Sequence, residues 1–167
     1  MVRRTYAPRG KTPIQEAWHR KGKVSAISAV TVSPALRRPD LVFRLLPEDA
    51  NARGEDTAAL LARLRGRIRG PMTILWDQSK IHEKSGVVRK DLAKHPEIVT
   101  EDFPGYAPDA NPDEGVWGWT KDHRLPNYAP EGTHELRFRV WEGLSTLSRR
   151  PALLASFIRH AGIPLRL

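Results

Sequence analysis

The sequence predicts an α/β fold, in which a mixed sheet is flanked by helices. Two observations support this class: short β-branched runs alternate with segments of helical periodicity, and glycine or proline separates most of them. The length of 167 residues suits one domain with a sizeable core. No apolar run approaches the roughly 20 residues that a membrane-spanning helix needs, so no membrane partner is expected.

Four runs of apolar and β-branched residues predict strands. Arg38-Pro39-Asp40 has the composition of a turn between the first two of them. The run at 72–76 is continuously apolar, which suits a strand that is buried on both faces and paired in parallel. The predicted strands are 23–32, 41–46, 72–76 and 98–100.

Helices are predicted where apolar residues recur every three or four positions. In the first helix Leu60, Leu64 and Ile68 form one stripe, and Gly70-Pro71 ends it. The segment 103–112 is too rich in proline and glycine for regular structure, so it is expected to be a rigid loop. The predicted helices are 56–69, 87–94, one opening at Pro112, one capped by Thr133, and one from Pro151 that Gly162 ends.

Charge and composition narrow the function classes. The chain carries 28 Lys and Arg against 19 Asp and Glu, a formal charge of +9, which favours nucleic acid as partner and an acidic membrane surface second. Arginine accumulated by a GC-rich genome would give the same balance. The chain has no cysteine, which excludes disulfides, thiolate zinc sites and cysteine nucleophiles. The basic N-terminus lacks an apolar signal segment, so a cytoplasmic protein is expected.

Two acidic residues stand in distinctive settings. Asp77 follows the apolar run 72–76, and Glu114 follows Asn111 by three positions in Asn-Pro-Asp-Glu. One carboxylate at a strand end and one at a helix start can bring two oxygen ligands to a hard cation such as Mg²⁺. Both residues also have a simpler interpretation, because Asp77 suits a turn and Asn111 to Glu114 form a good helix cap.

Several segments together carry a family resemblance, which covers nearly the whole chain. They are Arg3-Arg4-Thr5-Tyr6-Ala7-Pro8-Arg9-Gly10-Lys11-Thr12-Pro13, Trp76-Asp77-Gln78-Ser79-Lys80-Ile81-His82, Pro104-Gly105-Tyr106-Ala107-Pro108, Asn111-Pro112-Asp113-Glu114 with Trp117 after it, and Phe157-Ile158-Arg159-His160-Ala161-Gly162. This set resembles the catalytic part of the mariner-like bacterial insertion-sequence transposases of the DDE superfamily. Gln78 departs from the asparagine that is usual in the family.

The resemblance implies an RNase H-like fold: a basic arm over 1–22, the core over 23–130 and C-terminal helices over 131–167. The family's first acidic residue lies on the first, central strand, upstream of the segment that here begins at Arg3. That strand and the helix-turn-helix region have no counterpart in the sequence, so the chain is expected to be the C-terminal part of a transposase. Its strands 23–32 and 72–76 would then keep open hydrogen-bonding edges.

The resemblance also implies the chemistry. Family members hydrolyse a phosphodiester and join the freed 3′-OH to target DNA, using two Mg²⁺ or Mn²⁺ ions. Asp77 would be a shared metal ligand and Glu114 a ligand of the second metal, with Asn111 and His82 in support. Trp117 and Trp119 suit core packing better than base stacking. Phosphate contacts would come from Arg63, Arg67, Lys121 and Arg124, although a solvated charged face looks the same in sequence.

Three functional hypotheses therefore stay open. The chain is a transposase-derived endonuclease domain that is inactive alone, or a second-frame fragment of a frameshifted transposase whose first Asp comes from the other frame, or a non-catalytic basic DNA-binding remnant. Its expected partners are transposon ends and target DNA, a second copy in a dimer, or an upstream transposase fragment. Its expected place is the bacterial cytoplasm, at the nucleoid.

Overall fold

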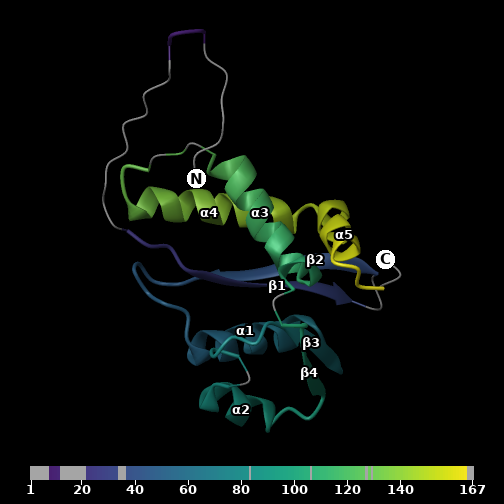
Figure 1. Cartoon of the computed structure of the whole chain (residues 1–167). Coiled ribbons are helices and arrows are strands. Elements are labelled where there is room, and N and C mark those ends of the chain that lie inside the picture. The colour runs from purple at the N-terminus through teal and green to yellow at the C-terminus, as the bar shows by residue number, and fades with distance from the viewer. Residues whose placement is uncertain are drawn as a thin grey trace.

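The computed structural model describes residues 8–11, 22–33, 37–82, 84–105, 107–126, 128 and 130–164. Most of the predicted basic arm over 1–22 lies outside these residues. In Figure 1 the antiparallel strand pair within residues 26–45 lies between the helices within 112–160 on one side and those within 54–92 on the other, and the second strand pair, within 72–102, lies on the side of the latter helices. This is the mixed α/β arrangement that the sequence predicted.

The strands form two separate pairs. β1 (Ala26–Ser33) and β2 (Arg38–Leu45) are antiparallel, whereas β3 (Met72–Trp76) and β4 (Ile98–Asp102) are parallel, as expected for the apolar run at 72–76. Within the described part of the chain, β1 and β3 do not pair with each other or with a third strand. Among the described strands, the edges of these two strands are therefore open as predicted.

The turn predicted at Arg38-Pro39-Asp40 is wrong, because these residues already belong to β2. Pro39 lies opposite Val32 in the antiparallel register. Proline has no N–H to donate, and sheets tolerate it mainly on edge strands. β2 pairs only with β1 among the described strands, so it is such an edge.

β3 is buried on one face rather than on both, which corrects the sequence prediction. Met72 and Trp76 are buried, while Thr73 and Leu75 between them are exposed, Leu75 to 40%. Val99 continues the uncovered face on β4 with 54% exposure. A continuous apolar run does not reveal that a face is left uncovered, because every residue in it would also suit a core.

In the described part of the chain, five α-helices begin within two residues of the predicted starts. They are α1 (Gly54–Arg67), α2 (Gly86–Leu92), α3 (Pro112–Arg124), α4 (Thr133–Ser148) and α5 (Pro151–His160), and a short 3₁₀ turn, η1 (Pro108–Ala110), precedes α3. Thr133 is the first residue of α4 rather than its cap, which is Gly132. None of the described helices is long and apolar enough to cross a bilayer.

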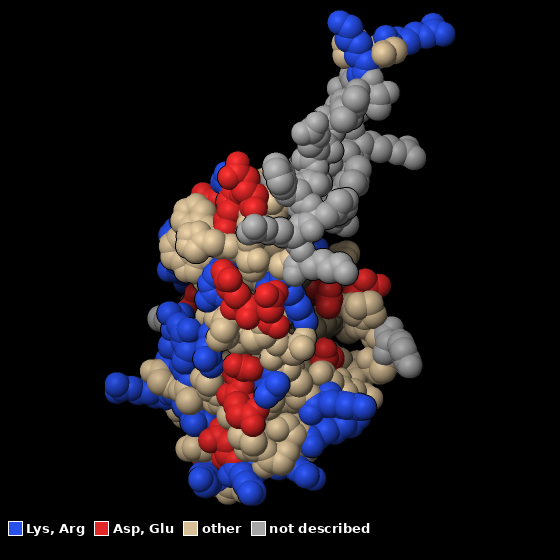
Figure 2. Space-filling model, turned by 90° about the vertical axis from the view of Figure 1, so that its left-hand side faces the viewer, with Lys and Arg blue, Asp and Glu red and all other residues tan. Residues whose placement is uncertain are grey.

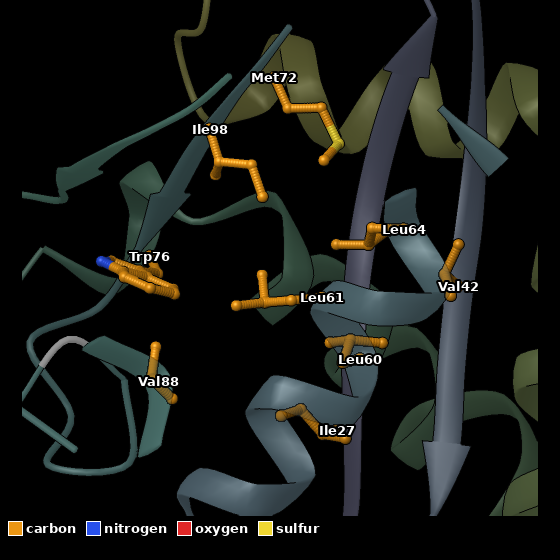
Figure 3. Close-up of a cluster of buried hydrophobic side chains, with 9 residues drawn as sticks. All are labelled: Ile27, Val42, Leu60, Leu61, Leu64, Met72, Trp76, Val88 and Ile98. Carbon is orange, nitrogen blue, oxygen red and sulfur yellow. The ribbon is translucent and has the colours of Figure 1, made fainter. Parts of the chain in front are cut away.

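One apolar cluster joins the two strand pairs through α1 (Figure 3). Leu60, Leu61 and Leu64 of α1 lie in the middle of the cluster. Ile27 and Val42 reach them from the first strand pair, and Met72, Trp76 and Ile98 from the second, with Val88 of α2 beside them. Because β1 and β3 do not hydrogen-bond to each other, this packing is the main connection between the pairs.

A second cluster fills the other side of the β1–β2 pair. Leu41 contributes from β2, and the helices contribute Val116, Val140, Leu144, Leu147 and Leu154. Trp117 and Trp119 pack against this cluster, so the prediction that they serve in packing is confirmed. Alternate residues of β2 face the two clusters, since Leu41 lies in one and Val42 in the other.

We expect the isolated chain to be only marginally stable, because two strand edges and one sheet face are uncovered. Its thermal unfolding, followed by circular dichroism, should have a midpoint below about 60 °C, the upper end for ordinary mesophilic domains. A cooperative transition above that temperature would contradict this expectation.

Leu61→Ala should lower the free energy of unfolding by about 2–5 kcal/mol, because the side chain is 2% exposed within the joining cluster. Urea unfolding at neutral pH measures the change. The exposed Val99 provides the matched control, since Val99→Thr should change the same quantity by less than about 0.5 kcal/mol. Equal effects of the two substitutions would show that α1 does not hold the strand pairs together.

Candidate active site

A hollow of about 280 Å³ opens at the carboxyl end of β3. We call it the Asp77 hollow, because Asp77 is the first residue after the strand and lines it. The parallel pairing of β3 and β4 places the ends of both strands at this edge, where polar side chains of neighbouring strands commonly meet. The full lining is Asp77, Gln78, Ser79, His82, Lys84, Arg89 and Asp102.

A tight turn holds Asp77 in place. The Ser79 N–H donates to Asp77 Oδ1 at 3.1 Å, and His82 Nδ1 lies 2.9 Å from that same oxygen and 3.0 Å from the Asp77 carbonyl oxygen. The His82 ring stacks on Trp76 with centroids 5.0 Å apart. Both side-chain contacts use Oδ1, so within the described part of the chain Oδ2 is free to bind a ligand, and the side chain is 63% exposed.

Asp102 is a second carboxylate in the Asp77 hollow, and sequence reasoning missed it. It pairs with Trp76 in the parallel register, and the Phe103 N–H donates to the Trp76 carbonyl oxygen at 2.8 Å, which extends the ladder by one step. The predicted strand ended at 100, two residues too early. No local sequence signal marked the residue, because its place at the hollow follows from the parallel register with β3.

Glu114 does not line the Asp77 hollow, and its side chain is exposed in the first turn of α3. The predicted cap is present, because Asn111 Oδ1 accepts the Asp113 N–H at 3.0 Å. Gly115 allows α5 to approach closely, since a Cβ there would lie 2.8 Å from the Phe157 ring. These contacts fix the direction of the helix start, but they do not bring Glu114 to Asp77.

Asp113 ties the start of α3 to β1. The Ser28 hydroxyl lies 2.7 Å and 3.0 Å from the two Asp113 carboxylate oxygens, and Trp117 Nε1–H donates to one of them at 3.0 Å. Burial raises the pKa of Asp113 above its ordinary value, and the charge of Glu114 adds to the rise, while the bonds from Ser28 and Trp117 partly offset it. Asp113 therefore fixes the residue next to Glu114 at the cost of desolvating a carboxylate.

The four predicted phosphate-contacting residues have different surroundings. Arg67 is paired with Asp40 at 2.6 Å, and Arg63 donates to the Phe43 carbonyl oxygen at 3.1 Å. Arg124 packs between α3 and α4, where it donates to Thr146 Oγ1 at 3.1 Å. Lys121 is exposed on α3.

The charges on one face of the molecule are mixed. Figure 2 shows acidic residues running down the middle of that face, with groups of Lys and Arg on both sides. The net charge of +9 is therefore not gathered into one continuous basic surface there. A role in phosphate binding has to be argued for particular residues rather than from the total charge.

The carboxylates of the Asp77 hollow are of the kind that binds a hard cation, but they are too few for a two-metal site. Asp77 and Asp102 offer the carboxylate oxygens that Mg²⁺ prefers. Lys84 and Arg89 line the same hollow with positive charge. Over the described ranges, no three His, Asp or Glu side chains are grouped closely enough to hold a metal ion, so these residues do not complete a two-metal site.

Comparison with known families and structures agrees with this architecture. Residues 1–137 match a family described as DDE superfamily endonuclease. The Mos1 mariner transposase paired-end complex with its left transposon end is 15% identical with a TM-score of 0.55, over 98% of this chain and 51% of that one. This likeness shows a shared fold, and the chain spans about half of that relative. A search of curated proteins gave no match.

Two structures of the Mos1 catalytic domain alone are also similar. The structure with raltegravir and Mg is 14% identical with a TM-score of 0.47, over 86% of this chain and 85% of that one. A second crystal structure of that domain is 13% identical with a TM-score of 0.48, over 86% and 83% of the two chains.

Asp113→Asn should make stability less dependent on pH. Since the pKa of Asp113 is raised in the folded state, its contribution to stability is complete below the ordinary value of 3.8 and is lost as pH rises through the raised pKa. Asparagine cannot ionise, so the variant should gain stability relative to the wild type between pH 4 and neutrality, by about 1.4 kcal/mol per unit of pKa rise.

Urea unfolding at several pH values measures this difference. Asp109→Asn is the matched control, because it removes one negative charge from an exposed residue two positions before the α3 cap. A wild-type protein that loses no stability relative to Asp113→Asn as pH rises would contradict the burial argument.

Proposed function

The chain belongs to the DDE superfamily endonuclease family, and we propose that it acts in DNA transposition through Asp77 and Glu114. The observation that carries the proposal is the Asp77 hollow, in which an exposed carboxylate with one unengaged oxygen stands at the end of a parallel strand. The fold shared with a mariner transposase supports DNA as the substrate class. The reaction would be cleavage of a phosphodiester followed by strand transfer.

Each residue has a distinct part in this proposal. Asp77 would be the shared metal ligand, held by the Ser79 N–H and by the ring of His82. Glu114 would be a ligand on the opposite side, directed by the Asn111 cap. Enzymes of this family generally use divalent metal ions, which stabilise the attacking and leaving oxygens of the phosphodiester when bound.

We further propose that the first acidic residue enters on a strand between β1 and β3. Two observations support this: neither strand has a partner on its inner side among the described strands, and α1 packs against both pairs. The inserted strand would hydrogen-bond to both edges and bring its carboxylate toward Asp77. Its source would be the rest of a transposase, in the same polypeptide or as a separate fragment, and this chain alone would be inactive.

A non-catalytic DNA-binding role is the second candidate. It is favoured by the charge of +9 and by Lys84 and Arg89, which line the Asp77 hollow. DNA affinity would then fall steeply with salt, because each neutralised phosphate adds nearly one to the slope of log affinity against log salt. The affinity would not respond to metal ions or to Asp77→Ala.

A complementation assay tests the catalytic proposal. We expect the chain alone to leave nicked duplex DNA intact in Mn²⁺. Addition of a peptide translated from the DNA upstream of Met1, in whichever frame encodes a strand with the first acidic residue, should restore cleavage. Asp77→Asn and Glu114→Gln should each reduce the restored rate by at least about 100-fold, since each removes a metal ligand.

Asp109→Asn is the control and should leave the restored rate unchanged. Strong cleavage by the chain alone that Asp77→Asn abolishes would show that no added strand is needed. Restored cleavage that survives Asp77→Asn would contradict the role of Asp77. Metal-independent DNA binding with no cleavage under any condition would favour the second candidate.

A further inference from the structure

A larger hollow, of about 520 Å³, lies along the outer edge of β2. We call it the β2-edge hollow. Its lining comes from β2, α1 and α4, and the two helices lie on opposite sides of the β1–β2 pair (Figure 1). Its lining shares no residue with the Asp77 hollow. The lining residues that matter here are Asp40, Arg63, Arg67, Arg137, Phe138 and Trp141.

Two arginines contact carbonyl groups at the C-terminal end of β2. Arg63 donates to the Phe43 carbonyl oxygen at 3.1 Å, and Arg137 donates to the Leu45 carbonyl oxygen at 3.4 Å and to that of Leu46. A strand that paired with this end of β2 would have to displace both arginines from the Phe43 and Leu45 carbonyl groups. The β2-edge hollow is therefore suited to a compact ligand rather than to an added strand.

Arg63 and Arg137 are not paired with a carboxylate among the described residues. Arg67 is neutralised by Asp40 at 2.6 Å, and Arg44, which also lines the hollow, lies 3.7 Å from Asp56. Arg63 and Arg137 contact only neutral carbonyl groups among the described residues. A guanidinium has five N–H donors, so each arginine is held in position and still has donors for an anion such as a phosphate.

Aromatic surface stands beside these charges. Phe138 and Trp141 are one helical turn apart on α4, 53% and 49% exposed, with ring centroids 6.2 Å apart. Single exposed aromatics are common and need no explanation. A stacked, half-exposed pair next to two anchored cations is the combination that binds unpaired nucleotides, whose base stacks on a ring while the phosphate meets arginine.

We propose that the β2-edge hollow binds an unpaired nucleotide of a DNA strand. The base stacks on Trp141 or Phe138, and the phosphate accepts hydrogen bonds from Arg63 and Arg137. The inference rests on the proposed function only in taking DNA as the ligand. In a duplex the bases remain stacked on one another, so the aromatic pair distinguishes unpaired from paired DNA.

Photo-crosslinking locates the contact. The probe is a fluorescein-labelled oligothymidylate that carries one 5-iodouracil, and the comparison is the same strand annealed to its complement. We expect the single strand to crosslink to the α4 peptide that contains Trp141, as read by mass spectrometry, and the duplex not to do so. A crosslink confined to other segments would overturn the proposal.

Fluorescence anisotropy measures how much each side chain contributes to DNA affinity. Trp141→Leu and Phe138→Leu keep an apolar side chain but remove the ring face, and each should weaken single-strand binding roughly tenfold while duplex binding is unchanged. Arg63→Gln should weaken it and lower its salt dependence. Arg159→Gln is the matched control, because Arg159 is exposed on α5 and outside the hollow. Thermal melting checks that the variants fold.

The outcomes separate this inference from the proposed function. Single-strand binding that is indifferent to both leucine variants would overturn the inference, while complemented cleavage of nicked duplex DNA would still support the function. Equal losses of single-strand and duplex affinity would also overturn it, since the hollow would then bind DNA without reading base pairing. Failure of the chain to bind single-stranded DNA would overturn the inference alone, because the proposed function is tested by complemented cleavage.

Discussion

The packing of α1 against both strand pairs is the interaction on which the rest of the molecule depends. β1 and β3 exchange no hydrogen bonds, so leucine side chains rather than a ladder set the distance between them. Side-chain packing defines a position less rigidly than a continuous sheet does. Asp77 follows directly after β3, and β1 holds Asp113 beside Glu114, so the packing of α1 contributes to the separation of the two candidate ligands.

The candidate site is accordingly built in two halves. In one half, Ser79 and His82 orient Asp77. In the other half, Asn111 caps α3 and Asp113 binds Ser28, so that Glu114 follows the position of β1. Each half is well ordered by its own hydrogen bonds. The halves belong to different strand pairs, so any element that bridges β1 and β3 would also bring the carboxylates into a defined relation.

The sequence was informative where one local interaction decides the outcome. The strand 72–76, the Asn111 cap and the helix starting at Pro151 all have such local causes. The sequence was misleading where a neighbouring segment decides the environment of a residue. Pro39 resembles a turn residue until β2 is known to be an edge, and Leu75 resembles a core residue until its face is known to be uncovered. Asp102 lies beside Asp77 because the parallel ladder between β3 and β4 extends to residue 102. The sequence of either strand alone does not show how far the ladder extends.

The locality of the two strand pairs has a kinetic consequence. β1 and β2 are joined by a short connection, and β3 and β4 by the segment that holds α2. Contacts between residues near in sequence form early, because little chain entropy is lost in making them. Each pair can therefore form during synthesis as soon as its own residues have left the ribosome. A strand made earlier in the same polypeptide, or on another ribosome, can then take its place between two pairs that form independently of it.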